Sequence, residues 1–592
     1  MPSEDLRSRG DRLTRHFLSR LFDNDLMSPE SDAHRGASMG LAGLLSAGAF
    51  ITVLLSSKYI MTPFPLPKWS AIEYIDDALF FVSVSMILLA LVAVVAWDGL
   101  ALDARDEAIL GPLPIQRSLI VRSKLAAMGI LAGAVLLAFN GPSTILHPIA
   151  AMAMLRVDVS SALRLMAVHA LVTAAAGLFG FCSVLALREA ARALVGPWWP
   201  AVSTRLQALL IVVLATTFLL IPGWMGRVAE RMVPVAGVDW RTAASPPMWF
   251  VGLHERLAGT VIVDVAGPPL PTRFRLTEER AAALHRQSRA GAAPLAVSAL
   301  TALSVSVTLA VAAFLWNARR PAARARTPRR GGVPRRSVLA RLIDATIART
   351  PAVQAGFAFT LRTLSRSVPH RAALAVAAAF GLALGTIAFG RAMRAPANGS
   401  SIQALLWTQT ILLAALFAGC EQAIRLPAHL PAAWSLRLAW PGDARGYVDG
   451  VKRAIAVGVA LPVLVVLLVP QLVFLGPLRA SAHAVVGLLV VLIALEARFA
   501  MAHPLPFLTS YVAGNRVKVA PIWFGGTLFL STVLSALETV ALSSVAGTGT
   551  LLGALALTWA GLAAIGRRNG APREDDLDLF QPQLDEATQL KL

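Results

Sequence analysis

The sequence is poor in charge and almost free of cysteine. Of its 592 residues, 15% are charged, whereas a soluble domain keeps about 25% of its residues charged to cover itself with polar surface. Its mean hydropathy is +0.64. This composition excludes an ordinary soluble domain. The two cysteines, Cys182 and Cys420, lie in or beside apolar stretches and do not form a pair with metal-ligand spacing. We therefore expect neither a redox centre nor a bound metal.

Two sequence motifs of enzymes are also missing. The sequence has no G-x-x-x-x-G-K-[ST] phosphate-binding loop and no H-E-x-x-H metalloprotease motif. A G-x-S-x-G pattern occurs at Gly36–Gly40, but it opens the first apolar stretch instead of lying at the strand-to-helix turn that the nucleophile motif requires. We therefore expect no catalytic residues, no cofactor and no enzymatic activity in this chain itself, and any ATP hydrolysis must come from a partner.

Apolar stretches dominate what is present, and many are long enough to cross a bilayer as a helix of about 20 residues. They predict an all-α polytopic membrane protein with about twelve transmembrane helices. Span 3 either ends at residue 140 or continues past Pro142 toward Leu155. The expected spans are 37–57, 78–97, 124–140, 164–187, 206–225, 293–316, 371–390, 402–420, 453–475, 482–501, 521–544 and 547–566.

The net charge of +20 comes largely from basic residues in the loops between these spans. Lys and Arg accumulate in alternate loops and in the linker after span 6, and such residues are retained on the cytoplasmic side. We therefore expect a multi-pass protein of the bacterial plasma (inner) membrane with both termini in the cytoplasm. Its surroundings are membrane lipid, and nucleic acid is not an expected partner. The first 36 residues are polar, so we expect no cleavable signal peptide.

The layout predicts two parallel six-span halves. Each half opens with a basic stretch whose apolar residues share one helical face, which is typical of an interfacial helix. The faces are Leu6, Leu13, Phe17 and Leu21 in the first half and Leu339, Leu342, Ile343 and Ile347 in the second. The expected organisation is a leader (1–36), a first half (37–316, with an extracytoplasmic segment at 226–292), a basic linker (317–370), a second half (371–566) and an acidic tail (567–592).

A long loop follows span 2 and joins it to span 3. It begins with acidic residues, among them Asp106 and Glu107, breaks at Gly111-Pro112-Leu113-Pro114, and enters span 3 at Lys124. Here the sequence resembles permease subunits of the type-2 ATP-binding-cassette exporters. The resemblance extends to the amphipathic leader, six spans per unit and the larger external segment. It implies that this loop holds a short coupling helix that docks on a separate ATPase subunit.

The corresponding loop of the second half, Cys420 to Arg453, departs from that pattern. It starts with Glu421 and contains Trp434 on a possible helical face with Leu430 and Leu438. Its placement fits a second coupling element, but its residues do not repeat the first loop. Two equal docking sites for the ATPase are therefore in doubt. The alternative for both loops is an interfacial helix that only anchors the spans.

Ionisable residues inside spans are functional candidates because burying them is costly. Glu538 in span 11 is the foremost candidate, for translocation or for helix packing. Glu496 and His169 more plausibly have local structural roles. In segment 226–292, the stretch 245–259 predicts a helix that either gates the outer leaflet or packs as a small cap.

Two other function classes stay open beside an exporter permease. The first is a secondary transporter of six plus six spans, driven by an ion gradient. The major facilitator fold has that layout, but its Gly…Asp-Arg…Gly-Arg-Arg motif after span 2 is missing here. The second is a membrane scaffold that transports nothing.

Overall fold

The computed structural model describes a chain of helices, and the described residues contain no strand. Eleven of the described helices are long and apolar enough to cross a membrane, and α20 adds a shorter apolar stretch at Leu528–Ala541. The protein is therefore an all-α polytopic membrane protein, as the sequence predicts. The description leaves out residues 1, 23–32, 62–66, 98, 101–105, 107–109, 111, 156–157, 225–227, 233–239, 259–271, 320–342, 344, 395–398, 427–442, 501–504, 508–519 and 569–592.

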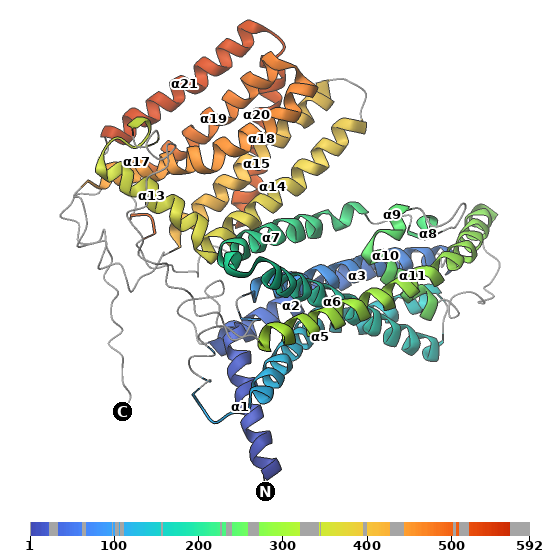
Figure 1. Ribbon diagram of the computed structural model, residues 1–592. Coiled ribbons are helices and arrows are strands. Elements are labelled where there is room, and N and C mark those ends of the chain that lie inside the picture. Colours follow the sequence, from blue (N-terminus) through green and yellow to red (C-terminus); the bar gives the residue numbers. More distant parts are fainter. Residues whose placement is uncertain are drawn as a thin grey trace. The chain divides into compact units, whose positions relative to one another are not determined.

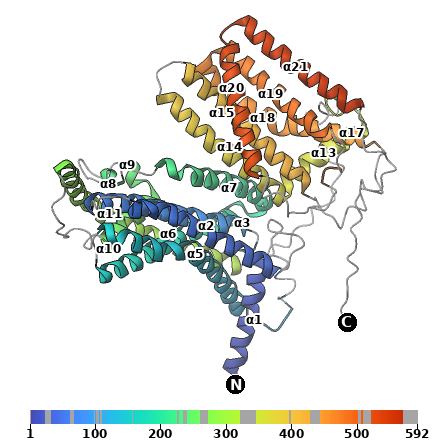
Figure 2. The ribbon, with the colours of Figure 1, turned by 180° about the vertical axis from the view of Figure 1, so that it is seen from behind.

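The chain divides into two compact units (Figures 1 and 2). The first unit comprises residues 1–210 and 217–330, and the second comprises residues 211–216 and 331–592. The elements up to residue 319 are α1 (Pro2–Phe22), α2 (Ala33–Met61), α3 (Pro67–Val95), α5 (Arg117–Leu155), α6 (Val159–Val195), η1 (Gly196–Trp198), α7 (Trp199–Trp224), α8 (Val228–Arg231), α9 (Trp240–Ala243), α10 (Pro246–Ala258) and α11 (Thr272–Arg319).

Several helices of the first unit are longer than hydropathy predicts. Helix α3 begins at Pro67 rather than at residue 78, and α5 continues through Pro142 and Pro148 to Leu155. Proline inside a helix removes one backbone hydrogen bond, and packing of α5 on α2, α3 and α6 holds the helix together across both prolines. Helix α6 starts where the Asp158 side chain accepts from the Ser161 amide, which caps its first turn.

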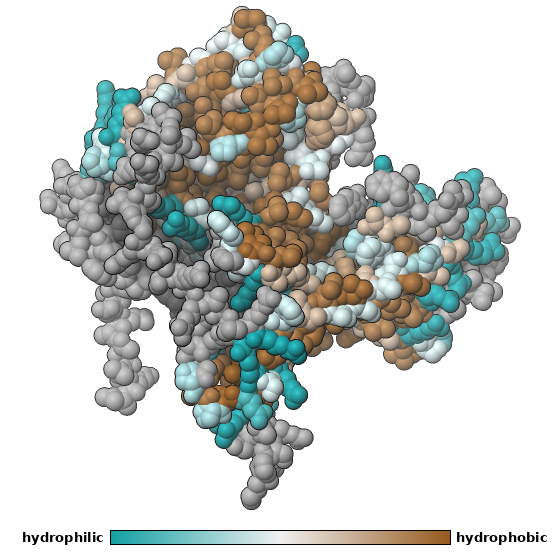
Figure 3. Space-filling model, in the orientation of Figure 1, coloured by the Kyte–Doolittle hydropathy of each residue, from teal (hydrophilic) through white to brown (hydrophobic). Residues whose placement is uncertain are grey.

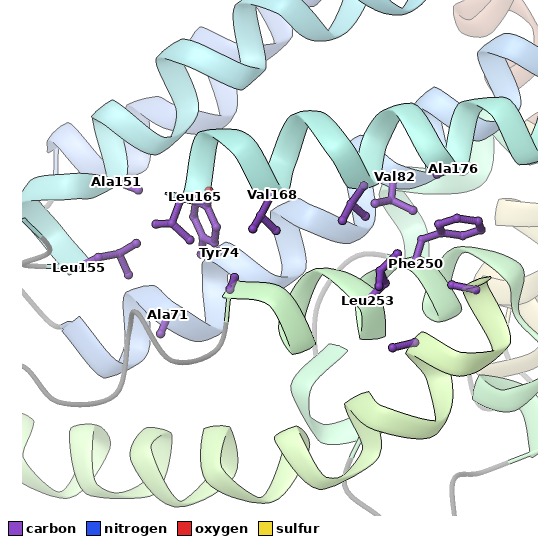
Figure 4. Close-up of a cluster of buried hydrophobic side chains, with 14 of the residues drawn as sticks. Ala71, Tyr74, Val82, Ala151, Leu155, Leu165, Val168, Ala176, Phe250 and Leu253 are labelled. Carbon is purple, nitrogen blue, oxygen red and sulfur yellow. The ribbon is translucent and has the colours of Figure 1, made fainter. Parts of the chain in front are cut away.

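The core of the first unit lies where α3, α5, α6, α10 and α11 meet (Figure 4). Tyr74 on α3 lies beside Leu165 and Val168 of α6, and Phe250 of α10 closes the other end. Gly180 lets α6 approach α3, since a Cβ at this position would lie 2.2 Å from the carbonyl oxygen of Met86. Helix α10 is therefore a packed part of the unit, and its position does not distinguish a gate from a cap.

The second unit contains two amphipathic helices and a bundle of apolar helices. Its elements are α13 (Pro351–Arg366), α14 (Val368–Arg394), α15 (Gly399–Arg425), α17 (Ala444–Ile455), the π-helical turn η3 (Ala456–Ala460), α18 (Leu461–Leu475), α19 (Pro477–Phe499), α20 (Ala520–Ala541) and α21 (Val545–Arg568). Helices α17, η3 and α18 run on without a break, so this span starts at Ala444 rather than at residue 453. Helix α21 lies alongside α19 at the edge of the bundle (Figures 1 and 2).

Each unit has an amphipathic helix packed on the first turns of its third long helix. In the first unit, α1 packs on α5, burying Leu13, Phe17 and Leu21 of the predicted apolar face. In the second unit, α13 packs on α17. The apolar face predicted at 339–347 is described only in part: Ile343 and Ile347 pack against the core of α13 and α17, while Leu339 and Leu342 lie outside the described residues.

Apolar side chains cover much of the surface of the described helices (Figure 3). In water, a soluble protein seldom exposes continuous apolar patches above a few hundred Å². Helix α21 has no buried residue at all, although it is 24 residues long and strongly apolar. Lipid tails are the environment in which such a surface is stable, which agrees with a membrane location.

Candidate functional site

Asp106, in the loop after α3, is buried inside the first unit. Its carboxylate pairs with Arg20 of α1, and its second oxygen lies 3.7 Å from the Lys124 ammonium of α5. In a coupling loop that docks on an ATPase subunit, Asp106 is expected to face the partner protein. It is turned inward instead, because it neutralises the nearly fully buried Lys124. Glu107 lies outside the described residues.

Further contacts of this group connect α1, the loop and α5. The Lys124 ammonium also lies 4.5 Å from the centre of the Phe17 ring of α1, a cation–π contact. The Ser123 hydroxyl donates to the Gly10 carbonyl at 3.2 Å. Ahead of α5, Pro112, Leu113 and Pro114 are exposed, with Leu113 47% accessible. The loop is therefore held in place at Asp106, whereas its tip, residues 112–114, is exposed.

In the second unit, Glu421 lies in the last turns of α15. Its carboxylate pairs with Arg425 of the same helix and with Arg498 of α19. Glu421 thus links two helices within the unit. Trp434 lies outside the described residues.

Glu538 of α20 is fully buried and makes a strong contact. One of its oxygens lies 2.6 Å from Nδ1 of His483 on α19, and the backbone carbonyl of His483 accepts from the side chain of Gln409 on α15 at 2.7 Å. Gln409 in turn accepts from Gln471 of α18 at 3.1 Å. This polar cluster joins four helices, so a helix-packing role accounts for Glu538, while a role in translocation stays a prediction.

The other two intramembrane candidates have local partners. Glu496 lies 3.0 Å from the Lys452 ammonium. Nε2 of His169 lies 3.0 Å from the Ser143 hydroxyl. These contacts agree with the local roles that the sequence suggested for both residues.

A second group of ionisable residues in the first unit was not singled out from the sequence. Asp77 of α3 is fully buried, and it accepts from the Lys58 ammonium at 2.8 Å and from the Tyr59 hydroxyl at 2.7 Å. Nε2 of His147 on α5 lies 3.6 Å from Asp77. Lys58 also pairs with Glu73 at 2.9 Å, and these two side chains are 36% and 34% exposed. The group therefore reaches from the surface to the core.

Residues of α10 lie next to this group and extend it farther into the unit. The Tyr74 ring stacks on His147 with 4.8 Å between centroids and lies 5.8 Å from the His254 ring. Glu255 lies between two imidazoles, 3.7 Å from His254 Nδ1 and 3.4 Å from His285 Nε2. Burial raises the pKa of Glu255, but the two imidazoles outweigh burial and lower it to about 2. We call His254, Glu255 and His285 the Glu255 cluster.

These groups can move or hold protons more readily than they can hold a metal. Within the described residues, no group of three or more His, Cys, Asp or Glu side chains has metal-binding geometry. Imidazoles and carboxylates near one another are, however, the groups from which proton pathways are built in membrane proteins.

Comparison with known proteins adds no relative to these observations. No protein family, no curated protein and no solved structure matches the chain.

Proposed function

We propose that this chain is the membrane-spanning permease component of an ATP-binding-cassette type exporter and works with a separate ATPase subunit. The observation that carries the proposal is the loop between α3 and α5. Ion-pair contacts of Asp106 with Arg20 and Lys124 hold one part of the loop in place, and its tip at Pro112–Pro114 is exposed.

Coupling to an ATPase needs such a stiff element. Movement of a docked subunit reaches the spans only if the contact behaves as a rigid body. The tip enters α5 directly, and α1 braces the first turns of that helix. A force applied at Leu113 would therefore move the 39-residue α5 instead of only bending the loop.

Two parallel six-span halves are part of the same proposal. The amphipathic helix packs on the third long helix in both units, α1 on α5 and α13 on α17. The fourth long helix of each unit carries a buried histidine followed by alanine, His169-Ala170 in α6 and His483-Ala484 in α19. In both helices the next two residues are aliphatic and end in valine. These repeats support the proposed duplication. The basic residues in alternate loops support the proposal that both termini lie in the cytoplasm of a bacterium.

A photo-crosslinking residue in place of Leu113 tests this function in native membranes. We expect it to capture a protein that carries the G-x-x-x-x-G-K-[ST] phosphate-binding loop. The matched control is the same residue in place of Leu194, which is 86% exposed near the end of α6 and is expected to capture no ATPase. Capture of lipid alone at both positions would contradict the proposal.

A proton-driven secondary transporter is the second candidate. The ionisable groups that run from Lys58 to His285 favour it, because proton relays of pumps and transporters use such residues. A scaffold that transports nothing has no particular observation in its favour.

A further inference from the structure

Glu255 is a buried carboxylate whose partners differ from those of Asp77 and lie farther away than the partner of Glu538. Asp77 lies 2.8 Å from the Lys58 ammonium, and Glu538 lies 2.6 Å from Nδ1 of His483. Among the described residues, Glu255 has ion-pair contacts with His254 and His285 and with no lysine or arginine. The balance of its charge therefore depends on histidine protonation.

The contacts of Glu255 are also loose. At 3.4 and 3.7 Å they exceed hydrogen-bond length. Both carboxylate oxygens, both nitrogens of His254 and Nε2 of His285 are buried without a hydrogen-bond partner among the described residues. Four of these atoms, the two carboxylate oxygens, His254 Nδ1 and His285 Nε2, lie in pairs 3.4 and 3.7 Å apart, which indicates a site that can share a proton.

A buried carboxylate between two neutral imidazoles would be an uncompensated charge. Such a charge is so costly that the cluster takes up a proton instead. We propose that the Glu255 cluster is a proton-binding site, whose ligand is one exchangeable proton held between the carboxylate and the two imidazoles. The proton moves between solvent and a ring nitrogen, and no other bond is made or broken.

A series of aromatic and ionisable side chains extends from the cluster toward partly exposed residues. Tyr74 lies between His254 and His147, and His147 approaches Asp77 near the partly exposed Lys58 and Glu73. Helix α10 packs against α3, α6, α9 and α11. These helices and α5 also carry other titratable and charged groups, among them Glu73, Tyr74, Asp76, Asp77, His147, Arg164, His169, Arg241, Arg286 and Arg289.

Two of these groups have other partners. Arg164 donates to the backbone carbonyl of Leu257 at 2.7 Å. Asp76 accepts from the Val228 amide at 2.9 Å. The proton site lies in the first unit alone and does not depend on which energy source drives transport.

The test is the pH dependence of unfolding of the full-length protein in detergent. If the folded protein holds one proton that the unfolded chain releases, the folding equilibrium constant falls tenfold per pH unit above the histidine range near 6.5. Glu255→Gln removes the charge that holds the proton. Relative to this variant, the wild type should lose about tenfold per pH unit above that range.

The control is Glu496→Gln, since Glu496 is a partly buried carboxylate paired with a lysine. Its stability should run parallel to wild type at every pH. His285→Gln, which keeps Glu255 and one imidazole, serves if Glu255→Gln does not fold, and its loss of stability should begin in the same range but end at a lower pH, because the folded variant holds the proton less tightly. A wild-type pH dependence in Glu255→Gln, or in His285→Gln if that variant alone folds, would overturn the proton site.

Discussion

Replacement of Asp106 by alanine should destabilise the first unit more than any other change of a single charge in its loops. It takes away the carboxylate that pairs with Arg20 and faces the buried Lys124. Removal of one partner from a buried ion pair costs about 3–5 kcal/mol, because the remaining buried charge loses a counter-charge. Thermal unfolding in detergent measures this loss, and the contacts of α1 with α5 should be the first to be lost.

A matched control and a double variant separate charge from packing. Asp11 is an exposed acid on α1, the helix that also carries Arg20, and Asp11→Ala should change stability by less than about 0.5 kcal/mol. Combining Asp106→Ala with Lys124→Met removes both buried charges and should recover much of the lost stability. If the double variant is less stable than either single one, the ion pair is not what holds the loop.

Replacement of Gly356 by alanine should disrupt the contact between α13 and α17. A Cβ at this position would lie 2.1 Å from the carbonyl oxygen of Tyr447. A backbone atom cannot turn aside as a side chain can, so the two helices must separate. Overpacking of this kind costs about 1–3 kcal/mol, occasionally more, and a lower melting temperature should report it.

Gly553 of α21 is the control for that change. No heavy atom lies within 4 Å of a Cβ built there. Gly553→Ala should therefore leave stability unchanged or raise it by up to about 1 kcal/mol, the helix preference of alanine over glycine. Equal effects of the two substitutions would mean that close approach of α13 and α17 does not matter to the fold.

Much of the membrane architecture could be predicted from the sequence. Apolar length alone located the spans, because backbone polar groups must be satisfied within a helix in lipid. The ends were less predictable. Span 2 was placed at residue 78, but α3 starts at Pro67, so Asp76 and Asp77 are part of a helix rather than of a loop. Helix α13 was missed as a separate element, because its apolar face is interrupted by polar residues and precedes a stronger apolar stretch.

The histidine and carboxylate groups could not be predicted as a site. Lys58, Asp77, His147, Glu255 and His285 come from five helices, and no spacing in the sequence brings them together. The available signal was the pair His254-Glu255 inside an otherwise apolar helix. The orientation of Asp106 was equally hidden, since only the packing of α1 on α5 shows which cations lie beside it.

Purification of the tagged wild-type protein from its native membrane in mild detergent tests the exporter proposal most directly. The chain lacks a phosphate-binding loop, so an exporter must bring its ATPase with it. We expect an ATP-binding-cassette ATPase to copurify in a fixed ratio and the complex to hydrolyse ATP. Absence of any ATPase, together with transport in membrane vesicles that follows a proton or sodium gradient, would contradict the account.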